Sequence, residues 1–209
     1  MVIIGMKSKK IIAITGSIST GKSTVSRILK DEGYLVIDAD KITHELMKKN
    51  NINYRKIVEV FGKNILDENL EIDRKKLGEI VFKSNQNLSK LNSITHPNIF
   101  NKMKEIIKNS KTEIIFLDIA LLIELIDQKS RYLNGLNISE IWLVYCDKES
   151  QLERLMKRNN LTKKEAQTKI GAQMDIEAKI KYANFILDNT KDLDYLKLQI
   201  MKKLENLWK

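Results

Sequence analysis

A glycine-rich segment near the N-terminus carries the strongest chemical signal in the sequence. Residues 16–23 read Gly-Ser-Ile-Ser-Thr-Gly-Lys-Ser and satisfy the pattern G-x-x-x-x-G-K-[ST] between an apolar run at 10–15 and a helical pattern that begins at Lys22. In such a loop the backbone N–H groups and the helix N-terminus bind phosphate, the lysine reaches the β- and γ-phosphates, and the last hydroxyl can ligate Mg²⁺. The alternative is a glycine turn that happens to precede a lysine. We therefore predict a nucleotide phosphate site formed by Gly16, Ser17, Ile18, Ser19, Thr20, Gly21, Lys22, Ser23 and Thr24.

Acidic residues follow two further apolar runs. Asp38 and Asp40 come after residues 34–37, and Asp118 comes after residues 113–117. Phosphoryl transfer requires little beyond placement and charge compensation, so one carboxylate of the first pair could take the proton of an acceptor hydroxyl while its neighbour positions the metal or the substrate. Two solvated turn aspartates are the alternative. Asp118 ends its run in the manner of a Walker-B aspartate and could hold Mg²⁺ through water, although one such residue alone is not diagnostic.

Two arginines stand four residues apart in a helical pattern. Arg154 and Arg158 therefore share one helix face, where guanidinium groups could close over the transferring phosphates as part of a lid. A solvated helix face is the alternative, and the preceding phosphate loop favours the lid.

Strand and helix patterns alternate along the chain. The runs expected to be strands are residues 10–15, 34–37, 113–117, 140–145 and 185–187, and the expected helices are residues 22–32, 121–127, 151–158, 162–183 and 193–208. Gly33 is placed to end the first helix, and Thr162 with Glu165 forms a capping-box pattern. Alternating strands and helices predict an α/β fold with a three-layer parallel five-stranded sheet, which places ligands at the carboxyl ends of the strands.

The stretch between the second and third strands has a different pattern. Residues 41–111 are amphipathic and helical, with interruptions at Phe61-Gly62, around residues 67–69 and at Pro97. We predict a helical insertion at 41–110. The core then comprises residues 1–40 and 111–209, with a lid at about 150–180.

Composition excludes several classes of protein. The 209 residues include one cysteine, Cys146, and two histidines, His44 and His96, which leaves no internal disulfide and too few ligands for structural zinc. No apolar run approaches the length of a membrane span, and no export signal precedes the first strand, so we expect a cytoplasmic protein. A net charge of +10 attracts polyanions of any kind, but basic and aromatic residues do not alternate as they do in nucleic-acid platforms. We expect no nucleic acid and no membrane as partners.

Seven segments together resemble those of the dephospho-CoA kinase family in motif, order and spacing. They are TGSISTGKST, VIDADKITHEL, IDRKKLGEIVF, LNSITHPNI, FLDIALLIE, QLERLMKRNNLTKKEAQTKIGAQM and EAKIKYANFILDN, and they extend from about Ile11 to Asn189. The resemblance implies a P-loop kinase core, a helical region that binds the CoA moiety, and a lid. It also implies ATP and Mg²⁺ as cofactors and transfer of the γ-phosphate to the 3′-hydroxyl of dephospho-CoA, the last step of coenzyme A biosynthesis, by a monomer or small homo-oligomer.

The same resemblance implies roles for individual residues. Asp40 is expected to be the general base, Arg158 the catalytic lid arginine and Asn189 the residue beside the adenine of ATP. The motif and the helix spacing already predict Lys22 as a further catalytic residue and Arg154 as a contact to ATP. Ser23 and Asp118 are the expected metal ligands. The residues expected at the acceptor substrate are Asp38, Arg74, His96, Pro97, Leu121, Leu122 and Glu124. For His96, a core histidine is the alternative.

Several residues depart from the family pattern. Ser17 and Ser19 replace glycines, which would strain the loop if either position needs a positive φ. Ala120 replaces a proline, and His44 replaces an arginine that would contact an acceptor phosphate. Two other activities stay open at this point: another P-loop kinase acting on a nucleoside, nucleotide or small alcohol, and a regulatory nucleotide switch or nucleic-acid-binding NTPase.

Overall fold

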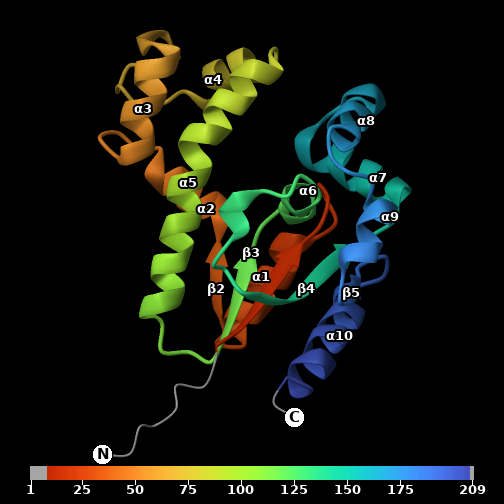
Figure 1. Ribbon diagram of the computed structural model, residues 1–209. Coiled ribbons are helices and arrows are strands. Elements are labelled where there is room, and N and C mark those ends of the chain that lie inside the picture. Colours follow the sequence, from red (N-terminus) through yellow and green to blue (C-terminus); the bar gives the residue numbers. More distant parts are fainter. Residues whose placement is uncertain (1–8, 208–209) are drawn as a thin grey trace, which may run out of the picture. The chain divides into compact units, whose positions relative to one another are not determined.

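Five strands form one sheet in the computed structural model, which describes residues 9–207 (Figure 1). They are β1 (Lys10–Thr15), β2 (Leu35–Asp38), β3 (Ile114–Asp118), β4 (Ile138–Tyr145) and β5 (Phe185–Asp188), in the order β2-β3-β1-β4-β5. Strand β1 pairs in parallel with β3 and β4, and β4 pairs in parallel with β5. The predicted α/β fold with a parallel sheet is confirmed. The register places Ile14 of β1 opposite Asp118, so the end of β3 lies beside the start of the glycine-rich loop.

Two compact units divide the chain. One comprises the residues up to Ile37 together with those from Lys111 onward, which we call the sheet unit, and the other is Asp38–Ser110, which we call the helical unit. Each is described by itself below.

Apolar residues cover both faces of the sheet, as expected for buried parallel strands. On one face, α1 (Lys22–Asp31) and α10 (Leu193–Glu205) pack against alternate strand residues such as Ile12, Phe116 and Trp142. On the other face, Ile123, Leu143 and Ile176 form a smaller cluster. The remaining helices of the sheet unit are α6 (Leu122–Asp127), η2 (Arg131–Leu133), α7 (Lys148–Asn159), α8 (Lys163–Gly171), α9 (Ile176–Lys179) and η3 (Ile180–Tyr182). Trp208, at the end of the last expected helix, lies outside the described residues.

The expected continuous helix over residues 162–183 is wrong in its second half. Its start is as predicted, because the Thr162 hydroxyl accepts from Glu165 N and the Glu165 carboxylate accepts from Thr162 N. After Gly171, however, Met174 N donates to a Glu124 carboxylate oxygen at 3.1 Å instead of continuing the helix. Asp175 then caps a new short helix. A side chain 50 residues away thus ends the helical pattern.

The helical unit contains α2 (Ala39–Leu46), α3 (Ile52–Phe61), η1 (Lys63–Ile65), α4 (Arg74–Val81) and α5 (Asn85–Asn109). Its core is the cluster of Ile57, Ile65, Leu77 and Val81. Gly62 ends α3 with φ of 82°, a left-handed conformation that a glycine adopts at little cost.

The expected break at Pro97 is wrong, since α5 runs through it. Proline lacks the N–H that would bond to the carbonyl four residues earlier. Two side chains near Pro97 donate hydrogen bonds to carbonyls of the preceding turn: Asn98 Nδ2 to Ile94 O at 3.1 Å and Thr95 Oγ1 to Leu91 O at 2.9 Å. Burial of Phe100 in the following turn further favours a continuous helix.

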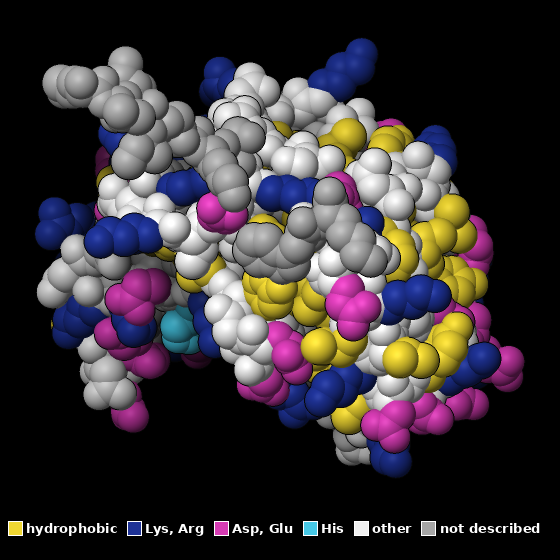
Figure 2. All heavy atoms as spheres, turned by 90° about the horizontal axis from the view of Figure 1, so that it is seen from below, with side chains coloured by type: hydrophobic (Ala, Val, Ile, Leu, Met, Phe, Trp, Pro, Cys, Tyr) yellow, Lys and Arg dark blue, Asp and Glu magenta, His cyan; other side chains and the backbone are white. Residues whose placement is uncertain are grey.

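Charged side chains of both signs are mixed on one face of the molecule (Figure 2). On the face shown in Figure 2, Lys and Arg side chains lie among Asp and Glu side chains. Within residues 9–207, no helix combines the length and the apolar character needed to cross a membrane.

Three polar contacts fix Glu140 near the start of β4, the strand between β1 and β5. Its carboxylate pairs with Lys10 at 2.7 Å and Lys203 at 3.0 Å, and accepts from Trp142 Nε1 at 3.1 Å. Burial alone would raise the pKa of Glu140, but the hydrogen bonds from these three side chains outweigh burial and lower the pKa to about 2. The charged form therefore stabilises the fold.

Replacing Glu140 with Gln should lower the free energy of unfolding at pH 7 by ~1–3 kcal/mol. Because the folded pKa lies below the ordinary value of 4.5, this contribution is complete above about pH 4.5 and is lost as the pH falls toward 2. Denaturant unfolding of both proteins at a series of pH values should show the difference narrowing in acid. The exposed Glu153→Gln is the control, and a pH-independent difference would contradict the assignment.

Candidate active site

The glycine-rich loop joins β1 to α1, and two of its glycines are sterically required. A Cβ on Gly16 would lie 2.6 Å from Thr20 Oγ1 and 2.8 Å from the backbone oxygen of Val144. Gly21 has φ of 99°, and a Cβ there would lie 2.1 Å from Asn189 Nδ2. The loop therefore packs against β4 and the segment after β5 closely enough to exclude any side chain at these two positions.

The serine departures have different consequences. Ser19 has φ of 62° and so occupies the left-handed region, in which an L-residue is disfavoured, whereas Ser17 is not among the positive-φ residues. The hydroxyl oxygens of both are buried, and no hydrogen-bond partner is found for either among the described residues. The expected strain is thus present at Ser19 and absent at Ser17.

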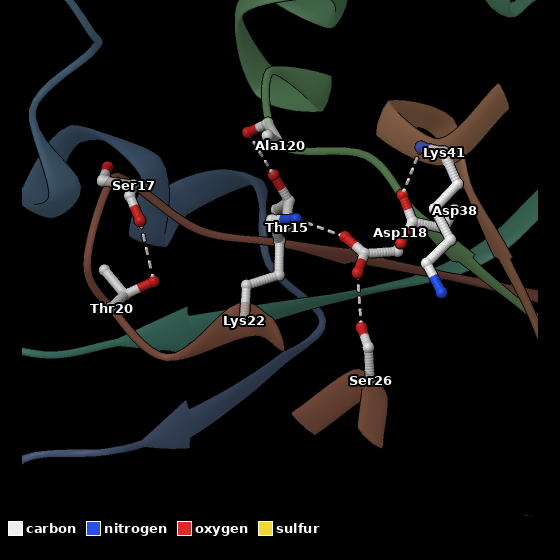
Figure 3. A network of polar contacts seen from close by, with 9 residues as sticks. All are labelled: Thr15, Ser17, Thr20, Lys22, Ser26, Asp38, Lys41, Asp118 and Ala120. Atoms are coloured by element: carbon white, nitrogen blue, oxygen red, sulfur yellow. Dashed lines mark hydrogen bonds and ion pairs between the residues drawn. The ribbon is translucent and has the colours of Figure 1, made fainter. Parts of the chain in front are cut away.

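A buried carboxylate lies beside the loop (Figure 3). Asp118, at the end of β3, is only 4% exposed. One of its oxygens forms an ion pair with Lys22 Nζ, and the other accepts a hydrogen bond from Ser26 Oγ at 2.5 Å. The lysine and the aspartate of the predicted phosphate site are therefore in contact. Ser26 was not predicted, because its position three residues beyond the motif carries no sequence signal.

Long-range hydrogen bonds fix the backbone of the loop. Asn189 Nδ2 donates to Thr20 O at 2.8 Å, and Ile18 N donates to Gln173 Oε1 at 2.8 Å. Thr15 Oγ1, at the end of β1, donates to Ala120 O at 3.1 Å. Gln173 lies in one of the segments that resemble the family, but the sequence predicted no role for it. The loop is thus held by residues from three other parts of the sheet unit.

The two arginines of α7 have different partners. Arg154 Nη2 donates to Asn189 O at 2.9 Å, which brings it together with a residue that contacts the loop. Arg158 is exposed near the end of α7, and its Nε donates to the side chain of Asn159 at 2.9 Å. Arg154 is therefore part of the packing around the loop, whereas Arg158 presents its guanidinium to solvent.

The segment after β3 contains three of the predicted acceptor residues. Leu121 is 46% exposed, whereas Leu122 is fully buried and packs in the core. Glu124 forms an ion pair of 2.7 Å with Lys179, whose side chain is 0% exposed. Leu121 is therefore exposed and Glu124 is partly exposed, at 17%, whereas the Leu122 side chain lies in the core of the sheet unit.

Asp38 and Asp40 lie at the N-terminus of α2 in the helical unit. Asp38 caps this helix, since its Oδ1 accepts from Lys41 N at 3.0 Å. Asp40 lies in the first turn, where the helix dipole favours a negative charge. Both carboxylates therefore lie at the start of one helix.

Three further predicted residues also belong to the helical unit. Arg74 begins α4, and its guanidinium contacts Nδ1 of His44, which must be the acceptor because guanidinium only donates. His44, at the position where the family pattern has an arginine, thus contacts the guanidinium of Arg74. His96 lies on α5 next to Pro97, packs edge-to-face against Phe100 at 6.1 Å, and burial lowers its pKa below the ordinary value.

Cys146 lies directly after β4 and beneath the loop. It is fully buried, its Sγ is 3.9 Å from Ser19 O, and burial raises its pKa to about 11. These are the surroundings of an unreactive thiol.

Comparison with known proteins gives one consistent result. A family model for Dephospho-CoA kinase matches residues 10–194. A dephospho-CoA kinase from Carboxydothermus hydrogenoformans is 44% identical over 202 residues, covering 95% of this chain and 94% of that relative. A solved dephospho-CoA kinase from Campylobacter jejuni is 33% identical with a TM-score of 0.62, covering 95% and 97% of the two chains. A crystal structure from Thermus thermophilus is 28% identical with a TM-score of 0.81, covering 97% of this chain and all of that one.

The strain at Ser19 predicts that Ser19→Gly stabilises the protein by ~0.5–1 kcal/mol. Relief of the left-handed conformation and removal of a buried hydroxyl without a partner outweigh the extra freedom of glycine in the unfolded chain. Ser17→Gly, which gains no relief of backbone strain, is the matched control and should be neutral or destabilising. Denaturant unfolding measures both, and an equal change in the two variants would show that φ is not the cause.

Proposed function

The chain belongs to the dephospho-CoA kinase family, and we propose that it transfers the γ-phosphate of ATP to the 3′-hydroxyl of dephospho-CoA, the last step of coenzyme A biosynthesis. The observation that carries the proposal is the family match over residues 10–194 together with a complete phosphate loop. The substrate is then a small molecule bound by the helical unit, and α7 and α8 form the lid.

The loop supplies the electrostatic part of the reaction. Lys22, now paired with Asp118, exchanges the carboxylate for phosphate oxygens when ATP binds. Backbone N–H groups of the loop and the N-terminus of α1 hold the remaining phosphate charge. The Arg158 side chain is exposed near the end of α7, and it adds a guanidinium to the phosphates when the lid closes.

The donor atoms near the loop fit Mg²⁺. Ser23 offers a hydroxyl and Asp118 a carboxylate, which are the hard oxygen ligands that Mg²⁺ prefers, so these two residues would hold the ion. When bound, Mg²⁺ neutralises charge on the β- and γ-phosphates. Arg154 and Asn189, which are hydrogen-bonded to each other, border the nucleotide.

The acceptor part of the reaction belongs to the first turn of α2. Asp40 acts as general base for the acceptor hydroxyl, and Asp38 keeps that turn in place through its cap. Arg74 offers a charge for the phosphates of dephospho-CoA, and its contact with His44 sets the direction of the guanidinium. His96, Pro97 and Leu121 provide contact surface for the rest of the acceptor.

Incubation with ATP, Mg²⁺ and dephospho-CoA should yield CoA, detected by mass spectrometry alongside release of ADP. Lys22→Ala should lower kcat by about 100-fold or more, because charge compensation at the phosphates is lost. Lys30→Ala, an exposed lysine on the same helix, is the control and should leave the rate unchanged. Bound ATP without any CoA would point to another acceptor or to a nucleotide switch.

Asp40→Asn should lower kcat by about 100-fold or more and leave the affinity for ATP within about threefold of the wild type, because the base acts on the acceptor and not on the nucleotide. Initial rates give kcat, and calorimetric titration with ATP gives the affinity. Glu45→Gln, on the same helix, is the control. A loss confined to ATP affinity would mean that the Asp40 carboxylate serves the metal.

A further inference from the structure

Ser26 lies outside the phosphate motif but inside the same constellation. It is the fifth residue of α1 and only 3% exposed. Ser26 follows the predicted metal ligand Ser23 by three residues on the same helix. A buried helical serine commonly donates to a carbonyl of its own preceding turn. Here its hydroxyl instead reaches the Asp118 carboxylate, 92 residues away, at 2.5 Å (Figure 3).

The two oxygens of Asp118 have partners of different kinds. Oδ1 faces the ammonium of Lys22, which is carried on a long, flexible side chain that can turn toward bound phosphate. Oδ2 faces a short side chain that is fixed by the first turns of α1. When Lys22 leaves Asp118, the hydrogen bond from Ser26 still orients the carboxylate.

We propose that Ser26 is a positioning residue for the magnesium site: its hydroxyl holds Oδ2 of Asp118 so that Oδ1, released by Lys22, points to the hydration shell of the metal. This inference rests on the proposed function only through the metal role of Ser23 and Asp118. A hydrogen bond from a hydroxyl to a buried carboxylate also favours one rotamer of that carboxylate. Nothing in this role requires the acceptor substrate.

A merely structural role makes a different prediction. If the hydrogen bond only joined α1 to β3, its loss would weaken nucleotide binding equally with and without Mg²⁺. If Ser26 positions Asp118, its loss should reduce only the gain in affinity that Mg²⁺ provides.

Calorimetric titration with ATP, in EDTA and again in Mg²⁺, separates these cases. For Ser26→Ala, the Mg²⁺-dependent gain in affinity should fall about 10-fold, as expected for one charge-assisted hydrogen bond, while binding of metal-free ATP stays within about twofold of the wild type. Ser26→Thr retains the donor and should recover most of the gain. Ser93→Ala, an exposed serine on α5, should behave as the wild type.

The double variant with Asp118→Asn makes the test specific to the carboxylate. If Ser26 acts through Asp118, Ser26→Ala should have no further effect on the Mg²⁺-dependent gain in the Asp118→Asn background. An additive loss, or an equal loss of affinity in EDTA and Mg²⁺, would overturn the proposal. Because the titrations contain no acceptor, failure to phosphorylate dephospho-CoA would leave their result intact, and absence of ATP binding by the wild type would instead refute the nucleotide site itself.

Discussion

A carboxylate withdrawn from water needs compensating partners, and the arrangement of the sheet unit around the loop follows from satisfying Asp118. Its position at the end of β3, opposite Ile14, places its charge beside the end of β1. Lys22 and Ser26 reach it from α1 and satisfy one oxygen each. An uncompensated charge at this depth would cost several kcal/mol. A buried Asp118 at the end of β3 therefore requires α1 to lie close enough for Lys22 and Ser26 to reach it. The phosphate loop is the connection between β1 and α1, next to this carboxylate.

Hydrogen bonds from distant residues then fix the shape of the loop without any ligand. Asn189 holds Thr20 O, and Gln173 holds the Ile18 amide. Gln173 lies just after α8, and Asn189 accepts from Arg154 of α7, so the loop is linked to both ends of the proposed lid. A displacement of the lid must therefore either carry these contacts with it or break them. Two amide side chains therefore link the shape of the loop to the position of the proposed lid.

The sequence predicts well those features that depend on local pattern. The phosphate motif, the five strands and the capping box at Thr162 each depend on nearby residues, and the strands and the cap are observed where they are expected. Errors arise where contacts with distant residues outweigh that local pattern. Met174 N bonds to the Glu124 side chain instead of to a carbonyl of its own helix, and α5 continues through Pro97. The contacts of Ser26 and Gln173 were missed for the same reason, although Gln173 lies in a segment that resembles the family. Their partners lie 92 and 155 residues away, and no spacing rule connects them.

The single thiol of the chain lies beneath the loop that binds phosphate. Cys146 is fully buried under Ser19 O, and its pKa of about 11 leaves almost no thiolate at neutral pH. A thiol reagent can therefore react with it only after this part of the sheet unit opens. Since the sequence contains no other cysteine, the rate of labelling measures how often the structure around Cys146 opens. The native chain thus carries a built-in chemical probe of the motions around its nucleotide site, with no added label and no substitution.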